Sequence, residues 1–385
     1  MAIVESVEQF LHERAQRPRV VALGEPTHGM EIFPSLRNDL LRRLVDREEC
    51  RCVTLESDCL AGQLVDDYVH GGDGDLDQVM ADGFSHGFGA SQANRAMVEW
   101  LRKHNLTHAG QVRFAGFDAP METSGAQSPR EPLRLLHTFL TAQGTDVPHP
   151  WSRIEALLGD DDRWSNPAVI MDPSQSIGDS AEARELRAIA DDLAWLLTVE
   201  TPRFTTDSAE AELGARTAAG LLAYHATLAR TELRERFAHA MGLRDAMMAA
   251  NLEALAARDP LLVFAHNQHV RRGPARWGLN GMNGWWNPAG AHLARRLGPD
   301  YVVIATAIGS APALGLDAPP ANTVEGVLAA GGPAPRLVPT GELTKEIAAA
   351  GVDLTTRTTP NFRYIPLDHD LLDGFDAVLF LPHVE

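Results

Sequence analysis

Residues 20–29 constrain the fold of this chain more than any other stretch, because a short apolar run ends there in Gly-Glu-Pro-Thr-His-Gly. A helical pattern of apolar residues begins just after it, at Glu31. A strand, a tight turn and a helix in this order are typical of an open α/β sheet, in which ligands bind at the carboxyl ends of the strands. We therefore expect Glu25 and His28 to lie at such a binding edge.

Glu25 and His28 are three residues apart, and on a turn their side chains can form a hydrogen bond. The carboxylate would then fix the tautomer of the imidazole and raise its basicity, as a general base requires. A histidine in an ordinary strand–helix turn can make the same bond for purely structural reasons. This stretch alone leaves both interpretations open.

The composition restricts the class of partner. A formal net charge of −18 argues against nucleic acid or an anionic membrane. The apolar runs are no longer than a strand, and residues 1–17 lack the apolar core of a signal peptide, so we expect a cytoplasmic protein that spans no membrane. The three cysteines are odd in number and fit no zinc spacing, which predicts reduced core thiols. The sequence fits a monomer but does not determine the oligomeric state.

The order of the expected elements predicts the fold class. Apolar runs at 20–23, 52–55, 112–117, 261–265, 301–307 and 377–381 read as strands, and helical patterns separate many of them. Between 130 and 258 the pattern is helical only, at 131–142, 151–159, 180–199 and in a long run, 207–258, that we expect to be broken once. We predict an α/β fold with a mostly parallel central sheet flanked by helices, in which 1–129 and 259–385 form the core and 130–258 is a helical insertion.

Polar, ionisable residues follow four of the predicted strands, and these residues are Glu25 with His28, Glu56, Asp118, and His266 with His269. Because the carboxyl ends of parallel strands meet at one edge of a sheet, these side chains should share a cleft. Arg37 lies nine residues after His28 on the next helix, from which it could reach a carboxylate of this cleft or a substrate oxygen. The helical insertion and the tryptophan-bearing loop 277–287 are expected to form the walls of the pocket.

Two chemistries suit this set of residues. One is activation of water by a histidine base that a glutamate orients, with other groups stabilising an oxyanion. The other is a zinc site, since His-x-x-His with a glutamate supplies good ligands. His266 and His269 leave a strand rather than lie on a helix, so they do not match the helical His-Glu-x-x-His signature. A fixed cation such as Arg37 would also disfavour a divalent metal. We expect neither metal nor cofactor.

Residues 83–87 match the Gly-x-Ser-x-Gly pattern of a nucleophile elbow. That elbow needs a strand before the serine and a helix after it. Here the preceding residues, 76–81, follow Asp75 in the manner of a capped helix. We therefore predict that Ser85 is not a nucleophile.

Residues 24–29, followed by Glu56, resemble the opening of the erythromycin esterase family. Later blocks of that family are similar, in order over nearly the whole chain, to residues 67–69, 100–102 with Asn105, 114–118, 244–251, 266–270 and 375–378. One departure concerns the substrate pocket, because many members have Met where Ala289 precedes Gly290.

The resemblance implies an α/β core with a large helical insertion, a deep cleft and metal-independent hydrolysis of a macrocyclic lactone. His28 would be the general base and Glu25 would orient it. The remaining roles would be to hold water, substrate and the oxyanion; we assign His266 and Glu56 to catalysis, and substrate contacts to Arg37, His269, Asp118, Trp285 and Trp286.

The favoured function is thus a hydrolase that opens an ester or lactone of a small-molecule substrate with His-activated water. A biosynthetic enzyme could use the same His/Glu pair for cyclisation, elimination or acyl transfer, and the sequence does not separate the two. A non-catalytic binding protein is a third hypothesis. The intact set of Glu25, His28, Glu56 and His266 argues against it, since a binder does not need a base and the group that orients it.

Overall fold

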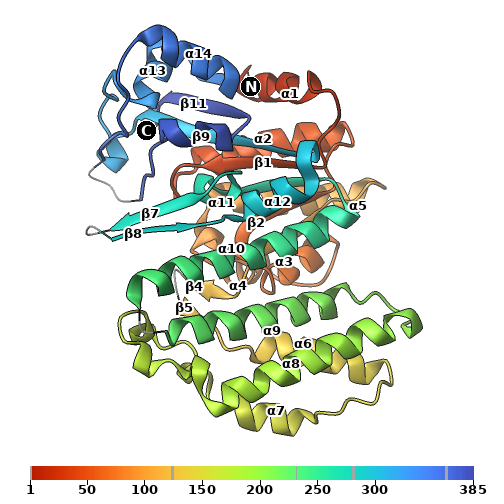
Figure 1. The fold of residues 1–385 in the computed structure, drawn as a ribbon. Helices are drawn as coiled ribbons and strands as arrows, with labels where there is room; N and C mark the ends of the chain where they lie inside the picture. Colours follow the sequence, from red (N-terminus) through yellow and green to blue (C-terminus); the bar gives the residue numbers. More distant parts are fainter. Residues whose placement is uncertain (1, 123–124, 231, 280–281, 360–362) are drawn as a thin grey trace.

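A seven-stranded sheet forms the centre of the computed structural model, which describes residues 2–122, 125–230, 232–279, 282–359 and 363–385 (Figure 1). The strands lie in the order β10 (Arg336–Pro339), β11 (Ala377–His383), β9 (Tyr301–Ser310), β1 (Val20–Glu25), β6 (Leu261–His266), β2 (Cys52–Asp58) and β3 (Arg113–Asp118). All neighbours are parallel except β10, which runs antiparallel to β11. The expected mostly parallel sheet is confirmed.

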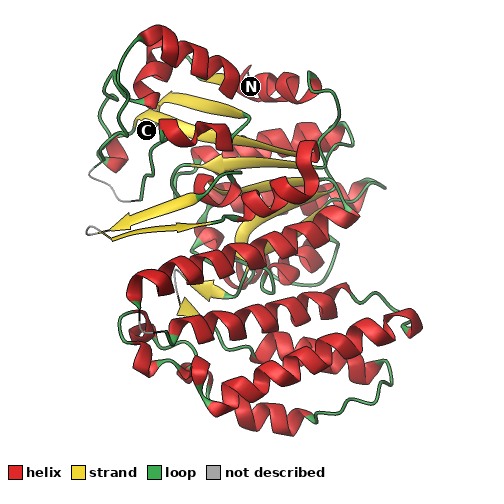
Figure 2. Cartoon of the chain, in the orientation of Figure 1, coloured by secondary structure: helices red, strands yellow, loops and turns green. Residues whose placement is uncertain are grey.

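Helices cover both faces of the sheet, as Figure 2 shows. On one face lie α1 (Ala2–His12), α2 (Ile32–Asp46), α3 (Gly62–Val69), α4 (Leu76–Asp82) and α5 (Gln92–Thr107). On the other lie α10 (Leu233–Arg258), α12 (Ala289–Leu297), α13 (Val324–Ala330) and α14 (Thr340–Ala350).

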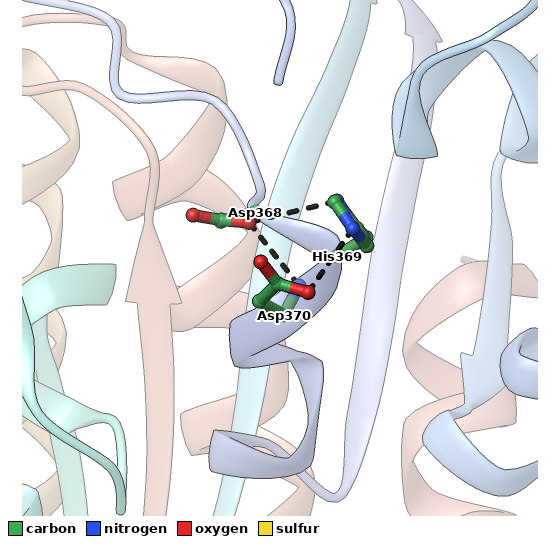
Figure 3. Close-up of side chains that lie close together, drawn as sticks. All are labelled: Asp368, His369 and Asp370. Carbon is green, nitrogen blue, oxygen red and sulfur yellow. Dashed lines mark hydrogen bonds and ion pairs between the residues drawn. The ribbon is translucent and has the colours of Figure 1, made fainter. Parts of the chain in front are cut away.

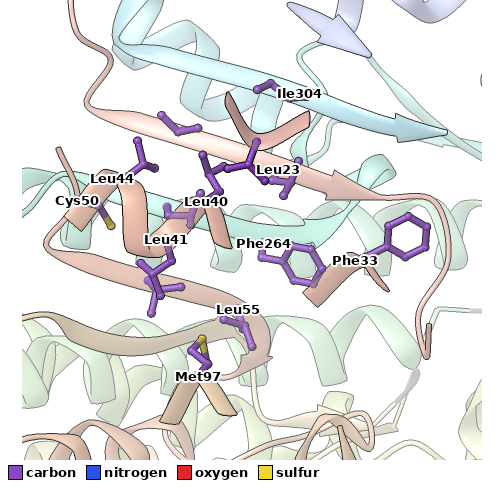
Figure 4. Packing of buried hydrophobic residues seen from close by; sticks show 14 of the residues in the cluster. Leu23, Phe33, Leu40, Leu41, Leu44, Cys50, Leu55, Met97, Phe264 and Ile304 are labelled. Carbon is purple, nitrogen blue, oxygen red and sulfur yellow. The ribbon is translucent and has the colours of Figure 1, made fainter. Parts of the chain in front are cut away.

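Successive residues of each strand point to opposite faces, so every central strand supplies both cores. Leu23, Leu55 and Phe264 belong to one core with the α2 side chains Phe33 and Leu40, as Figure 4 shows. Their neighbours Ala22 and Val263 belong to the core on the α10 side. The central strands are therefore buried on both faces, which explains why they read as continuous apolar runs.

The helices α6 (Arg130–Ala142), α7 (Trp151–Leu158), α8 (Ala181–Glu200) and α9 (Ala209–Leu228) pack around a core of their own, below the sheet in Figure 1. The long helical run is broken once, as expected, between α9 and α10. Helix α10 contacts both α9 and β3 and so joins this helical block to the sheet. The division at 129/130 and 258/259 stays a prediction.

Two expectations about strands need correction. The stretch 277–287, expected as a loop, contributes to an antiparallel hairpin of β7 (Ala275–Leu279) and β8 (Met282–Trp286). The signal was present, because Asn280-Gly281 is a dipeptide typical of two-residue hairpin turns, although these two residues lie outside the described part. Strand β10 was not predicted, because Arg336-Leu337-Val338-Pro339 is too short to show a period.

The remaining elements include β4 (Met121–Glu122), β5 (Gly125–Ala126), α11 (Asn267–Val270) and several 3-10 helices, among them η1 (Phe88–Ala90) and η9 (His369–Gly374). Among the described residues, no helix combines the length and the apolar character needed to cross a membrane.

The carboxyl end of β1 is held by a close approach of backbone and side chain. Asn267 donates from Nδ2 to Thr306 O over 2.9 Å and accepts from Thr306 N over 3.2 Å, which ties the end of β6 to β9 across β1. A Cβ atom on Gly24 would lie 2.3 Å from Asn267 Oδ1. The absence of a side chain at Gly24 is thus a packing requirement just before Glu25.

We expect Gly24→Ala to lower the free energy of unfolding by about 1–3 kcal/mol, because the added methyl group overpacks this junction. Urea denaturation would measure it. The same substitution at Gly341 is the matched control, since that glycine lies in α14 with open space around it and should change stability by less than about 1 kcal/mol. Equal stability of the Gly24 variant and wild type would contradict the packing argument.

Candidate active site

A cavity of about 780 Å³ opens at the carboxyl edge of β1, β2 and β6. Its lining includes most of the residues that the sequence placed there, namely Glu25, His28, Glu56, His266, His269 and Trp286. The apolar part of the wall comes from Met30, Leu55, Phe88, Met241, Phe264 and Ile365. Of the block 130–258, only α10 contributes described residues to this lining, so the expectation that the whole block forms the walls was too broad.

A row of alternating carboxylates and imidazoles crosses the floor of the cavity. Glu25 Oε1 lies 2.7 Å from His28 Nδ1, and His28 Nε2 lies 3.7 Å from Glu56 Oε1. The same Glu56 oxygen is 3.2 Å from His269 Nε2, and His269 Nδ1 is 2.8 Å from Asp245 Oδ1. We call these five residues the carboxylate–imidazole chain. His28 is its one substantially exposed member, since 40% of its side chain is accessible.

Backbone hydrogen bonds fix the turn that carries His28. Glu25 is the last residue of β1 and pairs in register with His266 of β6. The Pro26 carbonyl accepts from Ile365 N over 3.1 Å and from His266 Nε2 over 3.2 Å. The next turn residue, Gly29, has φ of 84°, a conformation that favours glycine. The turn is thus held from two sides, which limits the freedom of His28.

Burial and neighbouring charges have opposite effects on the pKa values of the carboxylate–imidazole chain. Burial alone would lower the pKa of His28, but the carboxylates of Glu56 and Glu25 outweigh it and raise that pKa above 6.5. Burial raises the pKa of Glu25, and the bond from His28 only partly offsets this.

In the other half of the carboxylate–imidazole chain, the neighbouring charges shift the pKa values further. Burial alone would lower the pKa of His269, but Asp245 and Glu56 raise it to about 10. Burial would likewise raise the pKa of Glu56, but His269, His28 and Arg244 hold it well below its usual value. At neutral pH Glu56 is therefore an anion and His269 a cation.

His266 differs from the other two histidines of the cavity floor. Burial, with the nearby His28, lowers its pKa to about 3. Its Nδ1 accepts from Gln268 N over 3.2 Å, and its Nε2 donates to Pro26 O. Both ring nitrogens are therefore engaged by backbone in the neutral state, and the ring stands edge-on to His28 at 5.4 Å between centroids. The geometry suits a residue that packs against His28 better than one that transfers protons.

Three of the expected substrate contacts do not line the cavity. Arg37 is fully buried, where it donates to Asn38 and Asn94 and lies over the ring of Phe264. Asp118 is also fully buried, and Trp285 is half exposed beside Arg276. Trp286 does line the cavity and donates from Nε1 to Asp245 Oδ2 over 2.6 Å.

Arg244 and Asp245, which lie side by side on α10, were not among the site residues expected from the sequence. Arg244 donates from Nε and Nη2 to Asp118 and from Nη2 to Glu56 Oε1 over 3.3 Å. Asp245 accepts from Trp286 and from Ala289 N and ends the carboxylate–imidazole chain. The available signals were the resemblance of residues 244–251 to a family block and a charged pair before the run Ala-Met-Met-Ala-Ala, inside a helix whose apolar pattern otherwise indicated packing.

The Gly-x-Ser-x-Gly segment supplies a histidine to the cavity rather than its serine. A helix, α4, precedes it as expected, and Ser85 is buried, with its Oγ accepting from Asp58 N over 2.9 Å. His86 lines the cavity, and its Nε2 lies 3.0 Å from Asp118 Oδ2. His86 was not among the site residues expected from the sequence.

Asp368, His369 and Asp370, shown in Figure 3, are the one cluster in the described part of the chain with the mutual spacing of metal ligands. Asp368 Oδ1 accepts from Asp370 N, and the other oxygen pairs with Arg276, so capping of η9 and an ion pair account for this carboxylate. In the cavity, the arginine beside Glu56 is Arg244, whereas Arg37, which we expected at the cleft, does not line it.

Comparisons with known proteins agree on one family. A family model described as Erythromycin esterase matches residues 45–384. The erythromycin esterase type II of Escherichia coli is 23% identical over 294 residues, which cover 74% of this chain and 67% of that protein.

Solved structures share the fold at low identity. A Bacillus cereus protein superposes with a TM-score of 0.72 at 17% identity, over 95% of this chain and 88% of its own. A mutant of the erythromycin esterase EreC in its open conformation superposes with a TM-score of 0.68 at 18% identity, over 98% of this chain and 94% of its own. A succinoglycan biosynthesis protein superposes with a TM-score of 0.66 at 16% identity, over 95% of this chain and 88% of its own.

We expect the stability of the protein to fall as pH rises from about 6.5 to about 10. His269 keeps its proton up to a pKa of about 10 when folded but loses it near 6.5 when unfolded, so its contribution is fully present below pH 6.5 and is lost across this interval. The loss should be on the order of 2–4 kcal/mol in denaturation experiments on wild type.

His269→Gln should flatten this alkaline loss, because the titrating group is gone. The control is His108→Gln, which changes an exposed histidine and should behave as wild type. Identical slopes in wild type and His269→Gln would show that His269 is not a cation in the folded protein.

Proposed function

Because the chain belongs to the erythromycin esterase family, we propose that it is a carboxylic ester hydrolase that opens a macrocyclic ester or lactone with a water molecule activated by His28. The 2.7 Å contact between Glu25 and His28 Nδ1 carries the proposal, because it directs the other nitrogen, Nε2, towards the cavity. A base held in this way is what hydrolysis without a metal requires.

The surroundings of His28 Nε2 suit a nucleophilic water. At 3.7 Å, Nε2 and Glu56 Oε1 are too far apart for a hydrogen bond to each other. A water molecule next to both atoms could donate one hydrogen to each, which would leave an oxygen lone pair for the ester carbonyl. His28 would then take the proton as the carbon–oxygen bond forms.

Two cations near Glu56 could stabilise the oxyanion that this attack creates. Arg244 and His269 both line the cavity, and the pKa of each is raised by neighbouring carboxylates that outweigh the effect of burial. Fixed positive charge placed where negative charge develops is often the largest single contribution to catalysis. His266 would support the site by packing against the ring of His28, and Arg37 by packing over Phe264, which lines the cavity.

The cavity supports a large, partly apolar substrate. Its volume of about 780 Å³ falls within the range of sites for drug-sized ligands, and Phe88, Met241 and Trp286 supply wide apolar surfaces. Incubation with erythromycin and a panel of lactones in oxygen-18 water tests the proposal. Label in the carboxylate product marks hydrolysis, whereas an unlabelled product would favour the biosynthetic alternative of cyclisation, elimination or acyl transfer.

We expect His28→Ala to lower turnover about 10²–10⁴-fold, because a positioned base is lost. Glu25→Gln should lower it less, since the amide oxygen can still accept from Nδ1 but carries no charge. Steady-state rates on the substrate found above would measure both, with His108→Ala as the matched control. Near-normal turnover of a folded His28→Ala protein would contradict the assignment of His28 as the general base.

The pH dependence should show a rising limb at a pKa above 6.5, because only neutral His28 can accept a proton and its pKa is raised. Glu56→Gln should move this limb to lower pH, since the carboxylate that favours the imidazolium is removed. Glu342→Gln, on the exposed side of α14, is the control and should leave the limb in place. A limb that moved upward in Glu56→Gln would contradict the assignment to His28.

A further inference from the structure

His86 has a backbone conformation that demands an explanation. Its φ is 57°, in the left-handed region, and it is one of two described residues other than glycine with positive φ, the second being Glu48. Residues other than glycine are uncommon in this conformation, although histidine, asparagine and aspartate adopt it more often than the rest. Strained residues of this kind cluster at functional sites, where the surrounding structure holds them. The His86 side chain lines the cavity.

The contacts of His86 distinguish its two ring nitrogens. Nε2 lies 3.0 Å from Asp118 Oδ2, and Arg244 holds that fully buried carboxylate through two nitrogens. Nδ1 lies 3.6 Å from an oxygen of the exposed Glu122, beyond hydrogen-bonding distance. Asp118 thus orients the ring through Nε2 and leaves Nδ1 as the nitrogen that can exchange a proton.

His86 and His28 flank the same part of the cavity. The ring of Phe88 stands edge-on to both, at 5.4 Å from His28 and 6.0 Å from His86. Arg244 Nη2 lies 3.4 Å from His86 Nε2 and 3.3 Å from the Glu56 oxygen that neighbours His28. An ester whose carbonyl oxygen binds Arg244 would therefore have one imidazole available to the attacking water and another to the leaving oxygen.

We propose that His86 is a second catalytic residue, which gives the proton of Nδ1 to the leaving alkoxide. The inference rests on the proposed hydrolytic function. A water O–H bond breaks, its proton goes to His28 Nε2, and the new carbon–oxygen bond forms. The bond to the leaving oxygen then breaks and that oxygen takes the proton of His86. Return of a proton from His28 to His86 through solvent completes hydrolysis of one ester by one water.

The test varies the leaving group. An aryl acetate such as p-nitrophenyl acetate releases a stable anion that needs little protonation, whereas ethyl acetate releases an alkoxide that must be protonated. His86→Gln keeps an amide that can donate to Asp118 but cannot replace the acid at Nδ1. We expect this variant to lose about 10²-fold or more on ethyl acetate and only a few-fold on p-nitrophenyl acetate.

The controls separate this role from a structural one. His28→Ala should lose activity on both esters, and His108→Gln should lose it on neither. His86→Gln should melt within about 3 °C of wild type; should it not fold, His86→Asn suits the left-handed backbone and serves instead. A parallel loss on both esters, or no loss on either, would overturn the role of His86 while leaving the hydrolase intact.

A spectroscopic measurement decides the matter without turnover. With nitrogen-15-labelled histidine, the resonances of His86, assigned by their absence in His86→Gln, should show a proton on Nε2, the nitrogen that faces Asp118. A protonated Nδ1 beside a bare Nε2 would refute the proposal. Wild-type protein that hydrolyses none of the esters and lactones would refute the proposed function instead.

Discussion

The site depends on one buried carboxylate, Glu56. Two imidazoles and a guanidinium lie within 4 Å of its Oε1, and the backbone N–H of His266 donates to its other oxygen over 2.8 Å. A carboxylate this deeply buried is costly unless it is paired and hydrogen-bonded. The residues that offset this cost are also those that line the floor of the cavity. Stability and chemistry therefore draw on the same contacts, and replacing Glu56 affects both.

The topology explains how residues so distant in sequence reach Glu56. Strand β1 lies between β6 and β9, both from the second half of the chain, and β6 separates it from β2. The turn after β1 thus stands next to the end of β6, and Glu25 pairs with His266. Helix α10 then crosses the same edge and brings Arg244. The fold assembles a site from segments more than 200 residues apart, as doubly wound sheets do at their carboxyl edge.

Sequence patterns predicted the part of the site that follows strands. Glu25, Glu56 and His266 end buried apolar runs, and parallel pairing alone is enough to bring them to one edge. The same rule could not find Arg244 and Asp245, because α10 is covered by α9 and by the sheet and so shows no clean polar face. His86 escaped for another reason. His86 lies in a loop and has a left-handed backbone conformation, and a loop has no periodic sequence pattern from which its position could be predicted.

Helix α10 also sets the limit of what can vary in this architecture. The helices α6 to α9 contribute no described residue to the cavity lining, so substitutions in them leave the lining residues unchanged and act on the site only through the packing of α9 against α10. The helix that follows them carries an arginine and an aspartate that complete the polar floor. A graft or recombination whose boundary falls after α10 would remove both, while one that falls between α9 and α10 would spare them. The boundary at which the helical block can be exchanged while these two residues are kept thus lies between α9 and α10, inside the helical run 207–258.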